Sequence, residues 1–260
     1  MAWYNEDNPE TLNFMVVGER KCGHGLLQSA LSAHPEMVCH GDVLHSEADT
    51  RKREHEEYFG DSGRVPDWYI PTYLSMEQYL NNKIFDNTLH GEKAVGVKVG
   101  YQQFVEQDLW DYTIGKCKQG DFCLVHVQRN PVACFVDLMR SGEGPEGSGF
   151  PRASQHIVTV EADALVSFVR DHMGTALKVD RLCDDRVVIP YHELLLDFRG
   201  MLLRLFSYLG IRYSSACIPN LRQVRQVRQR DIRSTVSNWE TLLRDVPSDV
   251  REQMDDPTLL

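Results

Sequence analysis

The chain has 260 residues, of which 42% are hydrophobic, and it contains four Trp, ten Phe and ten Tyr. These side chains are enough for a sizeable core, and no long linker rich in Pro, Ser or Gly divides the chain, so we expect a single domain over residues 1–260. The net charge of −10 argues against a general nucleic-acid-binding protein, which needs a broad basic face. A pocket for a small anion needs only a few local cations and is compatible with this charge.

Targeting signals and cysteine usage indicate a cytoplasmic protein. The first 14 residues carry neither a basic nor an apolar segment, so no signal peptide is expected. No apolar run approaches the roughly 20 residues of a membrane span. The seven cysteines are odd in number and lack C-x-x-C spacing, which favours reduced thiols. Cys39, His40 and His45 lie close in sequence, but no second ligand pair follows at zinc-like spacing, so we expect no metal.

Short apolar runs alternate with helical patterns along the chain. Strands are predicted at residues 13–17, 94–99, 122–128 and 186–190. Helices are predicted at residues 26–34, at about 132–140, and at 198–209 with Gly210 as the C-cap. Strands separated by helices predict an α/β fold in which a central parallel sheet is flanked by helices.

Two polar segments interrupt this alternation and are expected to be mobile. Residues 46–67 are rich in charges, and residues 141–149 carry glycines and acids but no core residue. Each segment either covers a site or is a solvated surface loop.

The segment GERKCGHG, residues 18–25, links the first predicted strand to the first predicted helix. A glycine-rich turn at this place binds anions, because its backbone N–H groups and the helix N-terminus point at the ligand. In the nucleotide triphosphate loop, GxxxxGK[ST], a lysine and a hydroxyl residue follow the last glycine. Here His24 and Gly25 take those places and Lys21 lies inside the loop, so ATP or GTP hydrolysis is disfavoured.

This loop and the segments after it resemble the sulfotransferase family, and in motif pattern the bacterial Nod-factor and trehalose-type sulfotransferases. The family turn K-x-G-[ST]-x-x-L is similar to KCGHGLL at residues 21–27, and the family H-P follows at His34. Further similar segments occur in family order: GDVL at 41–44, VGVK at 95–98, QRNP at 128–131, YHEL at 191–194 and VSNWETL at 236–242.

The resemblance covers residues 14 to about 243. It implies a P-loop-type, three-layer α/β domain with a central parallel sheet. It also implies transfer of a sulfuryl group, without a metal, from 3′-phosphoadenosine 5′-phosphosulfate (PAPS) to a hydroxyl or amine. The acceptor implied is a small molecule or a carbohydrate, and the sequence does not identify it.

The resemblance also implies roles for individual residues. Lys21 stabilises the leaving phosphate, and the rest of the loop surrounds the 5′-phosphate, with contributions from Arg20, Cys22, Gly23, His24 and Gly25. Arg129 binds the 3′-phosphate together with Arg228 or Arg230. The alternatives are that Lys21 and His24 face solvent, that Arg129 forms an ion pair with Asp137, and that the late arginines belong to a solvated basic helix.

Two positions depart from the family pattern. His24 replaces a serine or threonine of the loop, and Asp137, eight residues after Arg129, replaces the serine that binds the 3′-phosphate. A carboxylate beside a dianionic phosphate is repulsive unless a cation lies between them. Asp137 therefore pairs with Arg140 or Arg129, or Ser141 takes the role of the serine, or the donor pocket is altered.

The acceptor's proton needs a general base. The resemblance favours Asp42, and His40 and His45 are alternatives that titrate near neutral pH. The alternative is that Asp42 is a loop residue whose side chain caps the next segment. Lys98 lies near the carboxyl end of a predicted strand, where open α/β sheets bind ligands, and is a second cation for the sulfuryl group.

Two other functions stay open at this point. One is a P-loop kinase or NTPase, which would require magnesium. The other is a non-catalytic protein that keeps the fold and binds a ligand or partner through an altered donor site, as the substitutions at His24 and Asp137 allow.

Overall fold

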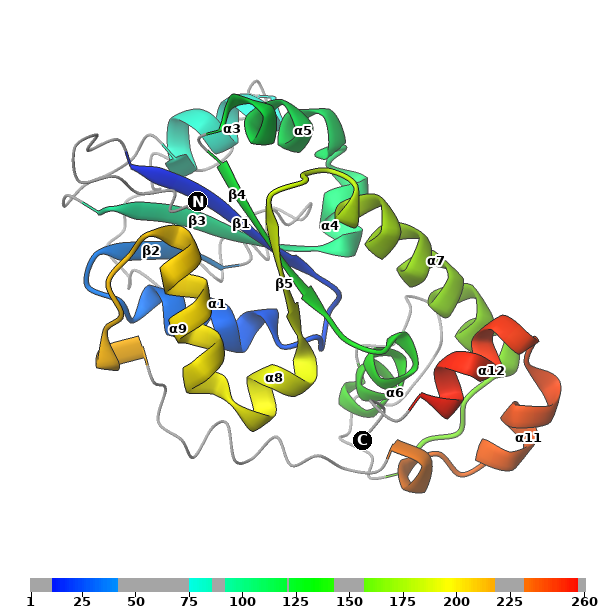
Figure 1. Ribbon diagram of the computed structural model, residues 1–260. Coiled ribbons are helices and arrows are strands. Elements are labelled where there is room, and N and C mark those ends of the chain that lie inside the picture. The colour runs from blue at the N-terminus through cyan, green and yellow to red at the C-terminus, as the bar shows by residue number, and fades with distance from the viewer. Residues whose placement is uncertain are drawn as a thin grey trace, which may run out of the picture.

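The computed structural model describes residues 11–41, 75–85, 92–120, 122–142, 157–217 and 232–256. In these residues one parallel sheet has the order β2-β3-β1-β4-β5 (Figure 1). Its strands are β1 (Leu12–Gly18), β2 (Met37–His40), β3 (Ala94–Gly100), β4 (Phe122–Gln128) and β5 (Arg186–Pro190). The predicted fold class, an α/β domain with a central parallel sheet flanked by helices, is confirmed.

The strand order fixes where a ligand can bind. After β1 the chain forms β2 at one edge of the sheet and then β3 between β2 and β1. It then crosses to the other side of β1, where it forms β4 and β5. The order therefore reverses between β1 and β4, and ligands of open α/β sheets bind outside the carboxyl ends of the strands at such a point. Gly18, the last residue of β1, pairs with Gly100 of β3 and Val127 of β4. The glycine-rich loop starts at this position.

The central strands are mostly apolar because helices cover both faces of the sheet. Every residue of β3 is buried, and the same holds for six of the seven residues of β4. The four predicted strands are confirmed to within one residue. The fifth, β2, was not predicted, because its four residues, MVCH, are too few to show a period.

On one face of the sheet lie α1 (His24–Ser32), α8 (Tyr191–Leu196) and α9 (Phe198–Leu209), as Figure 1 shows. They pack on the side chains of alternate strand residues, including Phe14, Val16 and Val125. The prediction of α9 is confirmed, and Gly210 ends it in the left-handed conformation. The helix α1 starts two residues earlier than predicted and ends at Ser32, before His34.

The other face is covered by α3 (Met76–Tyr79), the short π-helix η1 (Leu80–Phe85), α4 (Tyr101–Glu106), α5 (Trp110–Gln119) and the last turns of α7 (Ala162–Asp180). The 19-residue α7 was not predicted. Its buried residues are Leu165, Val169, His172 and Val179, at helical spacing, so a histidine occupies one position of an otherwise apolar stripe.

A third apolar cluster lies beyond the carboxyl end of β4. It joins α6 (Pro131–Ser141) and α7 to η3 (Ile232–Thr235), α11 (Trp239–Asp245) and α12 (Ser248–Asp255). Asn130 caps α6 by accepting from the N–H groups of Val132 and Ala133, and it donates to the Gln253 carbonyl. The remaining element, η2 (Ser215–Cys217), follows α9. Of the helices in these ranges, none is both long and apolar enough to cross a membrane.

The close contact between β1 and β3 generates the first prediction. A β-carbon at Gly96 would lie 2.2 Å from the ring of Phe14, its fully buried register partner. Gly96→Ala should therefore lower the free energy of unfolding in urea by about 1–3 kcal/mol. The control, Gly115→Ala in α5, adds a methyl group where no described atom lies within 4 Å, and should be neutral or stabilising. Equal destabilisation by both changes would contradict this account.

Candidate functional site

The glycine-rich loop connects β1 to α1 at the switch point of the sheet. A β-carbon at Gly18 would lie 2.5 Å from Cys22 Sγ, so only glycine fits there. Gly23 is the N-cap of α1 with φ of 93°, and it packs under Tyr191 and Leu194. No described side chain caps α1, and no described atom lies within 4 Å of a β-carbon built at Gly25. An uncapped helix N-terminus beside open space suits an anion.

Lys21 has the left-handed backbone conformation, with φ of 66°. This conformation costs a non-glycine residue about 1–2 kcal/mol, so other contacts must hold it. Arg129 Nη1 donates to the Lys21 carbonyl at 2.7 Å, and the Cys22 N–H donates to the Glu19 carbonyl at 3.1 Å. Burial raises the pKa of the Cys22 thiol to about 12, so Cys22 is a protonated core residue of the loop. Arg20, in contrast, is exposed.

The Arg129 guanidinium is the centre of the contacts below the loop. Its side chain is only 9% exposed, and Nη2 lies 2.7 Å from Asp137 Oδ2. The guanidinium carbon lies 4.2 Å from the centre of the Tyr191 ring. Asp137 also accepts from Arg140 Nη1 at 3.1 Å. The ion pair that the sequence left as an alternative for Arg129 and Asp137 is therefore observed. Ser141 Oγ donates to the Leu138 carbonyl.

Two further predicted residues are Lys98, which lies close to the loop, and His24, which belongs to it. Lys98 is buried in β3, at 8% exposure, and is the register partner of Val16 in β1. Burial raises the pKa of the thiols of Cys22 and Cys39, and the charge of Lys98 offsets part of this rise in both. The ammonium group therefore lies within electrostatic range of the loop. His24, the first residue of α1, is 8% exposed.

Several predicted site residues lie outside the described residues: Asp42, His45, Arg228, Arg230 and the segments 46–67 and 143–149. His40 ends β2 and is half-buried, and burial lowers its pKa. Within the described ranges, no group of three or more His, Cys, Asp or Glu side chains is placed to hold a metal ion.

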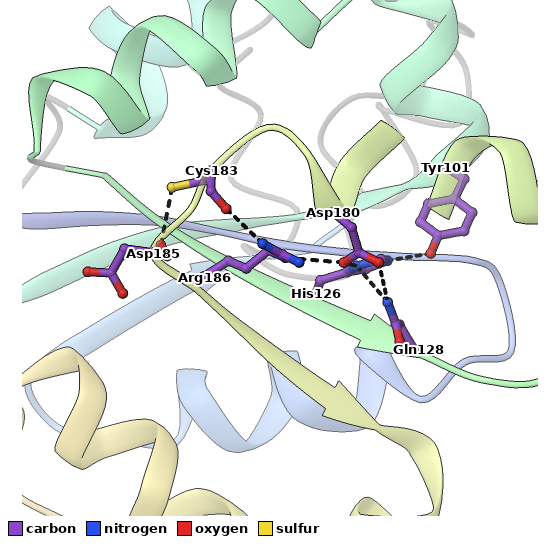
Figure 2. Close-up of polar contacts among 7 residues, drawn as sticks. All are labelled: Tyr101, His126, Gln128, Asp180, Cys183, Asp185 and Arg186. Carbon is purple, nitrogen blue, oxygen red and sulfur yellow. Dashed lines mark hydrogen bonds and ion pairs between the residues drawn. The ribbon is translucent and has the colours of Figure 1, made fainter. Parts of the chain in front are cut away.

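A second polar cluster, not predicted from the sequence, lies between β4 and α7 (Figure 2). His126 is fully buried, with Nε2 2.5 Å from the Tyr101 hydroxyl and Nδ1 2.9 Å from Asp180 Oδ1. Gln128 and Arg186 also donate to the Asp180 carboxylate, at 3.0 and 3.2 Å. Burial lowers the pKa of His126 in spite of the bond to Asp180. A neutral His126 then donates from Nδ1 and accepts from Tyr101 at Nε2.

A pocket of about 460 Å³ opens beside this cluster, and Gln128 and Asp180 of the cluster line it. Arg129 and Pro131 form one wall, and α7 forms the other with residues that include His172 and Leu177. His172 is 6% exposed, and its Nδ1 lies 3.8 Å from Glu19 Oε2 in the loop. Burial lowers the pKa of His172 to about 4 and raises the pKa of Glu19. In the sequence, His172 could have been found as a histidine at an apolar position in the helical pattern of α7, but that helix was not predicted.

No family model matches the chain, and no curated protein matches it. Several solved structures have a similar fold. A sulfotransferase from Alicyclobacillus acidocaldarius is 18% identical, with a TM-score of 0.46, and the match covers 92% of this chain and 98% of that one. The sulfotransferase domain of the Synechococcus PCC 7002 olefin synthase is 15% identical, with a TM-score of 0.45 and coverage of 84% and 80%. A sulfotransferase from Mycobacterium avium is 11% identical, with a TM-score of 0.42, and the match covers 93% of this chain and 79% of that one.

The buried ion pair generates the second prediction. Asp137→Ala leaves the Arg129 guanidinium buried without its carboxylate, so we expect the free energy of unfolding to fall by about 2–3 kcal/mol, less than for a fully buried pair because Asp137 is partly exposed. The measurement is urea unfolding. Asp249→Ala removes the carboxylate of an exposed pair with Arg170 and should cause a much smaller change. A loss at Asp137 no larger than the loss at Asp249 would be the contrary result.

The buried imidazole of His172 generates a pH prediction. Its pKa is about 4 in the folded chain and about 6.5 when unfolded, so the unfolded chain binds more protons between these values. The contribution of His172 to the free energy of unfolding should therefore rise by on the order of 3 kcal/mol from pH 4 to pH 6.5 and level off above.

Urea unfolding of His172→Gln at pH 5 and pH 7.5 measures this contribution. The variant should show a smaller difference between the two pH values than the unsubstituted chain. His192→Gln changes an exposed histidine that is in water in both states, and should leave the difference as it was. An unchanged pH dependence in His172→Gln would mean that His172 does not carry the effect.

Proposed function

We propose that the chain is a sulfotransferase that moves a sulfuryl group from PAPS to a hydroxyl or amine of a small-molecule or carbohydrate acceptor. The observation that carries the proposal is the glycine-rich loop at the switch point, with Lys21 inside it and His24–Gly25 in place of a lysine and a magnesium-binding hydroxyl. The order of the motifs along the chain supports the same activity.

In this proposal catalysis depends on position and electrostatics, as in phosphoryl transfer. The N–H groups at the start of α1, with Gly23, His24 and Gly25, bind the 5′-phosphate. Lys21 neutralises the leaving phosphate, and Lys98 faces the sulfuryl group. Asp42 takes the acceptor's proton.

The proposed site for the donor's 3′-phosphate already contains a carboxylate. A 3′-phosphate bound by Arg129 competes with Asp137, which already lies 2.7 Å from the guanidinium. In the proposal Arg228 or Arg230 supplies the additional positive charge, and Arg140 keeps Asp137 neutralised. This ion pair is also what favours the second candidate, a non-catalytic protein of the same fold that binds a different ligand.

Calorimetric titration with 3′-phosphoadenosine 5′-phosphate tests the donor. We expect micromolar binding that does not need magnesium and that weakens at least about tenfold for adenosine 5′-phosphate, which lacks the 3′-phosphate. Lys21→Ala should weaken the binding of both, because both carry a 5′-phosphate. Lys116→Ala, near the end of α5, removes one positive charge just as Lys21→Ala does, so it is the matched control and should bind normally.

Equal affinity for the two nucleotides would favour the non-catalytic candidate with an altered donor site. Tighter binding of Mg-ATP than of 3′-phosphoadenosine 5′-phosphate would overturn the proposal in favour of a kinase or NTPase.

A further inference from the structure

A carboxylate lies inside the loop that is proposed to bind an anion. Glu19 is the first residue after β1, and it is only 9% exposed. Its Oε1 accepts the N–H of Arg20 at 2.7 Å, so one backbone donor of the loop is already occupied by an anion of the protein itself. A negative charge at this place opposes the binding of a second anion, because like charges at close range repel.

The side chain that faces Glu19 from α7 does not neutralise it. Nδ1 of His172 lies 3.8 Å from Glu19 Oε2 and has no hydrogen-bond partner among the described residues. Burial lowers the pKa of His172 to about 4, and the nearby charge of His126 lowers it further in the same direction. Burial also raises the pKa of Glu19, while the N–H and the charge of Arg20 oppose this rise. Near pH 8 the carboxylate is therefore ionised beside a neutral imidazole.

The charge of Glu19 acts at the centre of the loop. Burial is the main reason why the pKa of the Cys22 thiol is raised, the charge of Glu19 adds to the rise, and the charges of Arg129 and Lys98 oppose it. One carboxylate and two cations thus lie within electrostatic range of the same loop atom. The affinity of the loop for an anion therefore depends on a balance of charges in which Glu19 is the negative member.

We propose that Glu19 makes the glycine-rich loop select its ligand by charge, weakening a phosphate with two negative charges more than a phosphate with one. Phosphates with one charge are those in a diester or an anhydride, and the 5′-phosphosulfate of PAPS belongs to this class. The selection requires only that the loop binds a phosphate, whereas the identity of the donor rests on the proposed sulfotransferase function.

The charge of the 5′-phosphate changes during the proposed transfer. The acceptor oxygen forms a bond to sulfur, the bond from sulfur to the bridging oxygen breaks, and the bridging oxygen keeps the electron pair. The sulfuryl group leaves with its own negative charge, and the acceptor's proton passes to the base and then to solvent. The 5′-phosphate is left with two charges in place of one. Glu19 therefore opposes the phosphate of the product more than that of the donor, and so promotes release of 3′-phosphoadenosine 5′-phosphate.

Two ligands that differ by one charge test the selection. They are 3′-phosphoadenosine 5′-phosphate, whose 5′-phosphate is a dianion at pH 8, and its 5′-methyl ester, which keeps one charge on that phosphate. Two unit charges about 6 Å apart change an affinity about threefold even at the dielectric constant of water. Calorimetry at pH 8 should therefore show that Glu19→Gln binds the methyl ester about threefold and the dianion about tenfold more tightly than the unsubstituted chain.

The variant and its control isolate the charge. Glutamine at position 19 can still accept the Arg20 N–H through its amide oxygen, so Glu19→Gln removes the charge and keeps the contact. Glu106→Gln removes one negative charge from an exposed residue at the end of α4 and should leave both affinities unchanged. A merely structural role of Glu19 would change both affinities by the same factor, and their ratio would stay as it was.

The ionisation of the bound ligand gives an independent measurement. The pKa of the 5′-phosphate in bound 3′-phosphoadenosine 5′-phosphate can be followed by ³¹P NMR, and it reports the difference in binding between the two charge states. Glu19→Gln should lower this pKa by about half a pH unit, since removal of the carboxylate favours the dianion. Glu106→Gln should leave it unchanged.

The outcomes separate the two proposals. If 3′-phosphoadenosine 5′-phosphate binds and Glu19→Gln leaves the ratio of the two affinities unchanged, selection by charge is wrong and the sulfotransferase proposal stands. If adenosine 5′-phosphate and its methyl ester bind as tightly as the 3′-phosphorylated pair and show the same dependence on Glu19, the selection stands and the proposed donor is wrong. Absence of binding for all of these nucleotides would overturn both.

Discussion

The buried guanidinium of Arg129 is the interaction on which the carboxyl end of the sheet depends. It holds the carbonyl of Lys21, the carboxylate of Asp137 and the ring of Tyr191, and so joins the loop to α6 and α8. A charge this deeply buried is tolerated only with partners, so the three contacts require one another. The left-handed conformation of Lys21 is maintained by the same group, because the bond to its carbonyl offsets the backbone strain.

On the face of the sheet covered by α7, the buried polar cluster consists of an uncharged histidine and a carboxylate with hydrogen-bond donors around it. His126 is neutral between Tyr101 and Asp180, and the Asp180 carboxylate accepts from three side chains. Such a network fixes the end of α7 against β4, and α7 in turn positions His172 beside the loop. Gln128 and Asp180 belong to this network and also line the pocket, so the hydrogen bonds help to set the geometry of the pocket.

The pattern of apolar residues and the glycines at turns made most of the sheet predictable from the sequence. The candidate site was predictable only in part. The runs of β1, β3 and β4 are long and apolar because they are covered on both faces, and Gly210 marks the end of α9. The loop could be located because a lysine among glycines is a local pattern. The roles of His126 and His172 could not, because each stands alone in an apolar stripe and obtains its partners, Asp180 and Glu19, only when distant segments pack together.

The same packing links the two ends of the proposed donor site. A phosphate that draws the Arg129 guanidinium away from Asp137 also acts on the Lys21 carbonyl, since both are held by one planar group. In the proposed donor site, binding at Arg129 and binding in the loop are therefore coupled, and by thermodynamic reciprocity each would change the affinity of the other by the same factor. A serine at position 137 would leave the guanidinium without a resident carboxylate and weaken this link. In the proposed site, the aspartate thus connects the loop to the 3′-phosphate position, because one guanidinium holds both Asp137 and the Lys21 carbonyl.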